Sequence, residues 1–153
     1  MIADMLNIKN ITIIEQVQDW REAIRVSLQG LVKGGYVEER YIDSVIQSTI
    51  HYGAYYILCN EVALIHGRPE DGVKNKQVAI TLLKNPVSFL EDGEYSVRLL
   101  VALAATDSNS HLDIMKVLVD ILSDKNKMEK MLNTNTVDEL YRMFLITEKE
   151  MEE

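Results

Sequence analysis

Apolar residues recur at intervals of three and four in two segments of the first third of the chain. The first series consists of Trp20, Ala23, Ile24, Ser27, Leu28, Leu31 and Val32. The second series consists of Tyr41, Ile42, Val45, Ile46 and Thr49. This spacing is that of one face of an α-helix, and glycines at 34, 35 and 53 follow where helix C-caps fall. The pattern therefore predicts two amphipathic helices.

Short apolar segments bounded by polar residues predict the strands of the first half. Residues 10–15 are rich in β-branched side chains and come before the first helix. Residues 55–59 and 62–65 are two further apolar segments, and Asn60 and Glu61 between them can turn the chain. We therefore expect one strand at 10–15 and a short pair of strands that ends at residue 65.

Two longer apolar segments, 77–83 and 97–105, show no alternation of polar and apolar residues. This is typical of interior strands that are covered on both faces. Pro86 and residues 91–94 should form an exposed connection between these strands. The loop at 67–72, which contains two glycines and a proline, leaves no room for a helix.

Helical spacing returns in the last third of the chain. A helix is predicted from the cap-forming residues 106–110 to about residue 124. A short helix is expected near 128–132 and another at 136–144, whereas the charged tail at 148–153 should be frayed.

Composition and charge narrow the class of protein. The 153 residues fit one domain, 1–153, and the formal net charge of -8 argues against a partner that is a nucleic acid. No apolar run approaches the ~20 residues of a membrane span, and residues 1–5 do not begin a signal peptide, so we expect a cytoplasmic protein. The one cysteine, Cys59, agrees with a reducing compartment and should be a buried small side chain.

Two of the three histidines, His66 and His111, follow predicted strands. Ligands of an open α/β sheet collect at the carboxyl ends of its strands, so two imidazoles that arrive there separately can meet at one site. Histidine acts as a nucleophile, acid or base near neutral pH. Imidazole chemistry is therefore the first functional hypothesis. The third histidine, His51, lies at a helix end where a cation is mildly favourable, which explains it without a catalytic role.

The neighbours of His66 allow a small anionic group to approach. Gly67 leaves space beside the ring and can adopt backbone angles closed to other residues. Arg68 offers a fork of donors suited to phosphate oxygens, but a side chain that is solvated, or paired with Glu70 or Asp71, is an equally good interpretation. Both alternatives stay open at this point.

His111 is expected in or near the first turn of a helix, where free N–H groups and the helix dipole favour an anion. A first-turn histidine without a ligand is the alternative. Ser108 and Ser110 have a ready role as helix caps and turn formers. Closely spaced His and Cys pairs and Gly-rich nucleotide loops are absent from the sequence, so we expect neither a metal nor a nucleotide cofactor.

Segment 62–73 resembles the active-site segment of enzyme IIA proteins of the bacterial sugar phosphotransferase system, of the mannitol/fructose type. It is most similar to the ascorbate-type branch, in which the histidine is followed by a small residue, Arg, Pro and Glu. Other segments also look familial and stand in the family's order: 20–24, 31–32, 34–37, 40–41, 52–56 and 105–111. The resemblance covers about residues 10–145.

The resemblance implies a phosphoryl relay. Such a protein takes a phosphoryl group from the histidine phosphocarrier protein and passes it to a cysteine of enzyme IIB, which works with the membrane enzyme IIC in uptake of a sugar or sugar acid such as ascorbate. By analogy His66 is the phosphorylated nucleophile and His111 stabilises the phosphoryl group, without metal or nucleotide. The residues expected to bind the group are Gly67, Arg68, Ser108 and Ser110. The expected fold is a three-layer α/β/α sandwich with a mixed, mainly parallel sheet.

The sequence departs from the family pattern just before the histidine. Ile65 stands where members usually have proline, and Cys59-Asn60-Glu61 replaces the more usual Ala-Pro-Gly. Since proline would stiffen the approach to the nucleophile, its absence can loosen or re-aim His66. The upstream arginine of mannitol-type members also has no match in residues 47–50.

These departures keep a second function open. The alternative is an enzyme IIA-like binding module that regulates a transcription factor or transporter with weak or no phosphoryl transfer. A third class, enzyme IIB itself, is a poor fit because no phosphate-cradling Ser/Thr-rich loop follows Cys59.

Overall fold

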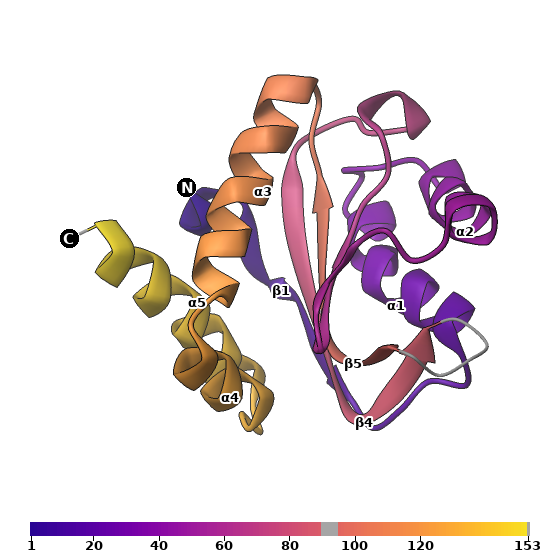
Figure 1. Cartoon of the computed structure of the whole chain (residues 1–153). Coiled ribbons are helices and arrows are strands. Elements are labelled where there is room, and N and C mark those ends of the chain that lie inside the picture. The colour runs from indigo at the N-terminus through magenta and orange to yellow at the C-terminus, as the bar shows by residue number, and fades with distance from the viewer. Residues whose placement is uncertain (90–94, 153) are drawn as a thin grey trace.

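A mixed sheet of five strands forms the middle layer of the computed structural model, with helices on both of its faces (Figure 1). The structure describes residues 1–89 and 95–152. In chain order the elements are η1 (Ile2–Asp4), β1 (Leu6–Ile14), α1 (Trp20–Lys33), α2 (Arg40–Tyr52), β2 (Ile57–Cys59), β3 (Glu61–Ile65), η2 (Pro69–Asp71), β4 (Gln77–Phe89), β5 (Tyr95–Ala104), α3 (Ser108–Leu122), α4 (Lys125–Leu132) and α5 (Val137–Glu152).

The strands lie in the order β1-β4-β5-β3-β2. The pairs β1/β4 and β3/β5 are parallel, and the pairs β4/β5 and β2/β3 are antiparallel. The predicted mixed sheet is therefore confirmed, but its pairs divide evenly between the two directions and the sheet is not mainly parallel. The short antiparallel pair that leads to His66 is β2 and β3, as expected from the turn at Asn60 and Glu61.

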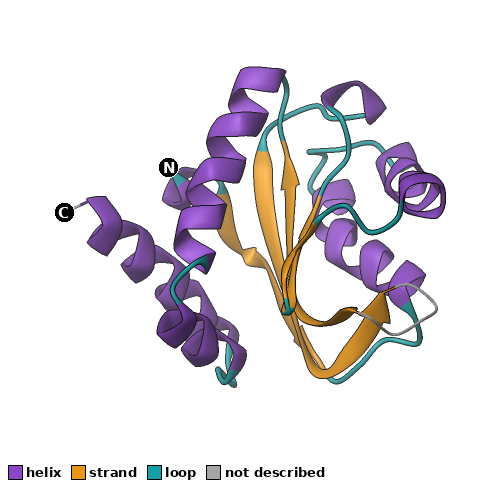
Figure 2. Ribbon diagram, in the orientation of Figure 1, coloured by secondary structure: helices purple, strands orange, loops and turns teal. Residues whose placement is uncertain are grey.

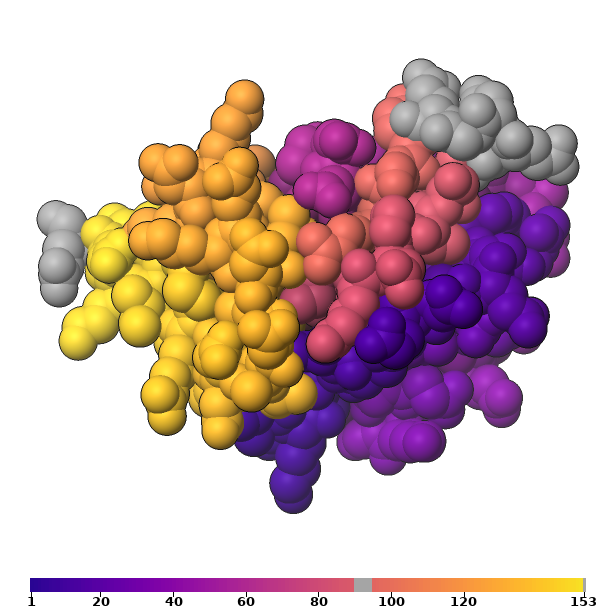
Figure 3. Space-filling view, turned by 90° about the horizontal axis from the view of Figure 1, so that it is seen from below, coloured from indigo at the N-terminus to yellow at the C-terminus, as the bar shows by residue number. Residues whose placement is uncertain are grey.

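Successive residues of the central strands enter two different hydrophobic cores. In β3, Val62 and Leu64 belong to the core shared with α3, α4 and α5, whereas Ala63 and Ile65 belong to the core shared with α1 and α2. Figure 2 shows the two helical layers on either side of the strands, and a view from below shows the C-terminal part of the chain, in orange and yellow, gathered at one side of the molecule (Figure 3). The interior strands are thus covered on both faces, which confirms the interpretation of their unbroken apolar runs.

β4 does not end before Pro86, as the sequence pattern predicted, but continues through it to Phe89. The pairing with β5 moves from Leu82↔Leu99 to Val87↔Val97, so five residue steps on β4 oppose two on β5. Pro86 is exposed within this bulge, where a missing N–H removes no ladder bond. The other part of the predicted connection, residues 91–94, lies outside the described residues.

Three smaller differences have local causes. β1 begins four residues earlier than predicted because Leu6 is buried and pairs with Val78 before a bulge. α4 begins at Lys125, where the Asp124 side chain accepts the N–H groups of the first turn. The loop expected to hold no helix contains one 3-10 turn, η2, since Asp71 can accept the Arg68 N–H.

The C-terminal tail is not frayed, because α5 continues to Glu152 and its Glu148 side chain is buried. The Glu148 carboxylate accepts the N–H of Ile2 at 2.8 Å and that of Ala3 at 3.3 Å, and lies 3.1 Å from the terminal ammonium group of Met1. The tail therefore has a partner at the opposite end of the chain.

Cys59 is exposed rather than buried. It ends β2, an outermost strand of the sheet, directly before the turn into β3, and no further strand of the described residues covers it. An apolar segment at a sheet edge is covered less completely than the same segment inside the sheet.

Candidate active site

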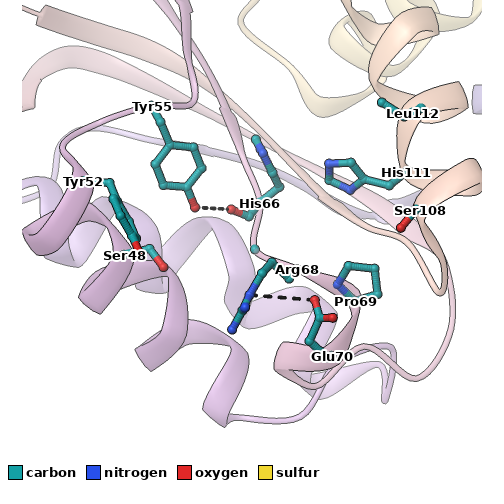
Figure 4. Close-up of a pocket in the computed structure, with 11 residues that line it drawn as sticks. Ser48, Tyr52, Tyr55, His66, Arg68, Pro69, Glu70, Ser108, His111 and Leu112 are labelled. Atoms are coloured by element: carbon teal, nitrogen blue, oxygen red, sulfur yellow. Dashed lines mark hydrogen bonds and ion pairs between the residues drawn. The ribbon is translucent and has the colours of Figure 1, made fainter.

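Parallel pairing of β3 and β5 brings the carboxyl ends of both strands to the same edge of the sheet. His66 is the first residue after β3, and His111 is the fourth residue of α3, which follows β5. Their ring centroids lie 5.0 Å apart, with the ring planes at 56° (Figure 4). The two imidazoles thus meet at one site.

The His66 ring is held in one tautomer by the backbone. Its Nδ1 lies 2.7 Å from the carbonyl oxygen of Leu64. A carbonyl oxygen only accepts hydrogen bonds, so Nδ1 carries the proton and the lone pair of the neutral ring is on Nε2. Burial lowers the pKa of His66, and nearby His111 lowers it further, against the bond to Leu64, which raises it. The neutral, nucleophilic ring therefore dominates at pH 7.

His111 is also held neutral, because partial burial lowers its pKa. Its backbone N–H is occupied by the carbonyl of Asp107 at 3.0 Å, so only its ring is available to a ligand. Asp107 is the N-cap of α3 and accepts the Ser110 N–H at 2.8 Å, a hydrogen bond that lowers the pKa of Asp107. Ser110 therefore serves the helix cap.

Arg68 is paired with acidic side chains, as one of the alternatives left by the sequence predicted. Its Nη2 lies 3.0 Å from Asp71 Oδ1, and its Nε lies 3.8 Å from Glu70 Oε1. Burial raises the pKa of Asp71, but the hydrogen bonds and charge of Arg68 outweigh burial and the net pKa is lowered. The Arg68 side chain is nevertheless 75% exposed, so its remaining donors can reach a ligand.

Gly67 is needed for close packing and not for its backbone angles. It is not among the residues with positive φ, and a Cβ at this position would come within 3.2 Å of Tyr41 Cε1. The same Cβ would lie 3.3 Å from Val45 Cγ2 and from Asp71 Oδ2. The predicted space beside the ring is therefore filled by α2 and η2.

An open pocket of about 780 Å³ surrounds the two imidazoles. It brings together five of the six predicted site residues, His66, Gly67, Arg68, Ser108 and His111, but not Ser110. The pocket also has lining residues that sequence reasoning missed: Ser48, Tyr52, Tyr55, Pro69, Glu70 and Leu112. Only Leu112 could have been found from the sequence, because it is a large apolar residue next to His111 that lies off the apolar face of α3.

Tyr55 is the most closely engaged of the missed residues. Its hydroxyl donates to the His66 carbonyl oxygen at 2.7 Å, and its ring meets the His66 ring edge-on with centroids 5.4 Å apart. Nothing in the sequence marks this contact, because Tyr55 reads as part of an apolar strand segment.

The departures before His66 are accommodated within the sheet. Ile65 is fully buried and pairs with Ala102 of β5, so the ladder holds the approach to His66 that proline would otherwise stiffen. Glu61, where the family usually has glycine, adopts a φ of 74°. This left-handed conformation is strained for a residue with a side chain.

Within residues 1–89 and 95–152, no helix is long and apolar enough to cross a membrane. Across the same residues, no group of three or more His, Cys, Asp or Glu side chains is placed to hold a metal ion.

A family model described as phosphoenolpyruvate-dependent sugar phosphotransferase system, EIIA 2, matches residues 4–146. The mannitol-specific cryptic phosphotransferase enzyme IIA component of Escherichia coli is 34% identical over 139 residues, which cover 91% of this chain and 94% of that protein. Its solution structure aligns with a TM-score of 0.87 at 32% identity, over 94% of this chain and 97% of the other.

The chain is also similar to an ascorbate-specific protein and to an enzyme IIA solved with its partner. The ascorbate-specific EIIA component of E. coli is 29% identical over 133 residues, 86% of each chain, so overall identity does not favour the ascorbate-type branch. The structure of a complex of mannitol enzyme IIA with phosphorylated enzyme IIB from E. coli aligns with a TM-score of 0.77 at 28% identity, over 90% of this chain and 94% of the other.

Proposed function

The chain belongs to the EIIA 2 family of the phosphoenolpyruvate-dependent sugar phosphotransferase system, and from this membership we propose that it is a cytoplasmic phosphoryl carrier whose phosphorylated residue is His66. The donor is the phosphohistidine of the histidine phosphocarrier protein, and the acceptor is a cysteine of enzyme IIB. Onward transfer serves uptake of a sugar or sugar acid such as ascorbate through a membrane enzyme IIC. The observation that carries the proposal is the His66–His111 pair, with the lone pair of His66 on Nε2.

In the first transfer, Nε2 of His66 attacks the phosphorus of the donor in line with the departing nitrogen. The P–N bond of the donor breaks as the Nε2–P bond forms, and no proton has to leave Nε2. The hydrogen bond from Nδ1–H to the Leu64 carbonyl stabilises the positive charge that the ring gains. In the second transfer a cysteine thiolate of enzyme IIB attacks the same phosphorus, and Nε2 recovers its lone pair.

The neighbouring side chains supply donors for the phosphoryl oxygens. His111 lies close enough for its ring N–H to donate to a group on His66, and Ser108 offers a hydroxyl from the same helix. Arg68 adds positive charge at the mouth of the pocket, while Asp71 keeps the guanidinium in place. Donors that are positioned before the reaction stabilise charge as it develops, which is the largest contribution expected of such a site.

The surroundings of the pocket suit a protein partner. Three large apolar side chains that line the pocket are exposed, Tyr52 at 74%, Tyr55 at 45% and Leu112 at 66%. Tyr52 and Leu112 line the pocket from α2 and α3, on opposite sides of His66 (Figure 4). Exposed apolar residues gathered at a functional site are typical of transient docking surfaces. The mannitol relative that was solved with enzyme IIB supports this kind of partner.

The test is phosphorylation with phosphoenolpyruvate, enzyme I and the histidine phosphocarrier protein, followed by intact mass under alkaline conditions. We expect one phosphoryl group on the wild type, none on His66→Ala, and slower or shorter-lived labelling of His111→Ala. His51→Ala is the matched control, because His51 is exposed at the end of α2 and does not line the pocket. An unlabelled wild type beside a charged phosphocarrier would contradict the relay and favour the regulatory module.

A further inference from the structure

The peptide between His66 and Gly67 is held from two sides by tyrosine hydroxyls. On one side, Tyr55 donates to the His66 carbonyl oxygen at 2.7 Å. On the other side, the Gly67 N–H donates to the hydroxyl of Tyr41 at 2.8 Å. Tyr41 in turn donates to the carbonyl of Leu103 in β5 at 3.0 Å. One chain of hydrogen bonds thus runs from Tyr55 through the peptide to the sheet.

The position of this peptide explains why it needs such support. The β3/β5 ladder ends at Ile65 opposite Ala102, one residue before His66. If the register continued, Gly67 would lie opposite Ala104 and its N–H would donate directly to Leu103. The Tyr41 hydroxyl is inserted at that point and bridges the two groups. The side chain therefore prolongs the ladder past the nucleophile where the backbones have separated.

The packing around Gly67 fits the same arrangement. Tyr41 is 1% exposed, and a Cβ on Gly67 would approach its ring to 3.2 Å. Only glycine lets the peptide come close enough for this hydrogen bond without displacing α2. Tyr55 lies on the opposite side of the peptide, on the segment before β2, and also contacts the His66 ring edge-on.

We infer that Tyr41 and Tyr55 are positioning residues that clamp the His66–Gly67 peptide and thereby fix the direction of His66 Nε2 toward His111 and the pocket. The sheet fixes the backbone before His66, and the clamp fixes it afterwards. With both sides held, the ring can keep its Nδ1–H bond to Leu64 and present Nε2 for in-line attack. Displacements near 1 Å at a reacting atom can slow a reaction about a hundredfold, so such support matters for transfer.

The rate measurement that tests this inference rests on the proposed function, whereas the measurement of the His66 tautomer does not. We would measure transfer from charged phosphocarrier to Tyr41→Phe, Tyr55→Phe and the double variant, and record the ¹⁵N signals of the His66 ring. Tyr56→Phe is the matched control, since the Tyr56 hydroxyl bonds Thr49 at 2.8 Å in the core but does not contact the peptide. Urea unfolding of each variant separates positioning from loss of the fold.

We expect kcat to fall about tenfold in Tyr41→Phe and about threefold in Tyr55→Phe, with KM for the phosphocarrier within about twofold. The double variant should fall by less than the product, because both hydroxyls hold one peptide. The ¹⁵N signals should show a loss of the pure Nδ1–H tautomer in both single variants but not in Tyr56→Phe.

Three results would overturn the clamp. The first is an unchanged tautomer in both tyrosine variants, the second is a change in KM alone, and the third is an equal slowing in Tyr56→Phe. If the wild type accepts no phosphoryl group, the relay fails, and the tautomer signals still decide the clamp.

Discussion

Replacement of Glu148 by glutamine should destabilise the protein, and the loss of stability relative to the wild type should be larger at neutral pH than in acid. The carboxylate accepts two backbone N–H groups, from Ile2 and Ala3, and faces the terminal ammonium group. Glutamine keeps one acceptor oxygen but turns an amide N–H₂ toward these donors. Hydrogen bonds to a charged group contribute about 1.5–3 kcal/mol each, so we expect a loss of about 2 kcal/mol, or a fall in Tm of roughly 4–8 °C for a chain of this size.

The stabilisation by Glu148 depends on pH in a direction that follows from its pKa. Burial raises the pKa of Glu148, but the N–H donors and the ammonium group outweigh burial, and the net pKa is lowered below its ordinary value of 4.5. A carboxyl with a depressed folded pKa stabilises the protein above its unfolded pKa, and this contribution is lost as the pH falls through the folded pKa. The gap between wild type and Glu148→Gln should therefore be full at pH 7 and shrink below about pH 4.

Urea unfolding followed by circular dichroism at pH 7, 5 and 3.5 would measure this gap. Glu152→Gln is the control on the same helix, because Glu152 is 66% exposed and its 3.9 Å ion pair should contribute less than about 1 kcal/mol. Equal stability of wild type and Glu148→Gln at pH 7 would refute the reasoning, as would a gap of constant size down to pH 3.5.

Three other predictions concern the site and the strand that carries it. Glu61→Gly should stabilise the protein by about 0.5–1 kcal/mol in urea unfolding, because glycine relieves the strain at φ 74° but loses more chain entropy on folding; a less stable variant would contradict this. Initial rates of phosphoryl acceptance should be flat from pH 7 to 8 and fall only well below pH 6.5, because burial lowers the pKa of His66, and a half-maximal rate above pH 7 would argue against this. Leu112→Asp should raise KM for the phosphocarrier about tenfold with little change in kcat, whereas Ile146→Asp on α5, at another exposed apolar position, should not; equal effects would exclude docking at Leu112.

The meeting of His66 and His111 could be predicted from the sequence, because each follows an apolar segment that becomes a strand. The two strands are parallel neighbours in the sheet, so the general rule for the carboxyl ends of strands applied. The apolar segments did not predict that β4 and β5 pair in the antiparallel direction, so the sheet has fewer parallel pairs than expected. Strand direction depends on which segments pair in space, and apolar patterning is the same for either direction.

The features that the sequence did not reveal depend on partners far away in the chain. Glu148 looks like part of a charged, frayed tail until the backbone of Ile2, 146 residues earlier, lies beside it. Tyr41 reads as a core residue of an amphipathic helix, and only the fold shows that its hydroxyl reaches Gly67. Periodicity identifies the buried face of an element but not the polar atom that a buried side chain presents to a neighbour.

The exposed thiol of Cys59 gives this protein a natural attachment point for a spectroscopic probe. It is the one cysteine in the chain, and it ends β2, two residues before β3 begins, whereas His66 follows the other end of β3. Five strand residues separate the two ends by about 16 Å at a rise of 3.3 Å per residue. Partial burial raises the pKa of the thiol, so coupling to a maleimide dye is slower than for a fully exposed cysteine at the same pH. Energy transfer between a dye there and a second dye on a partner can report the arrival of the partner at His66. The dye on Cys59 stays outside the docking surface, and no substitution in the protein is needed.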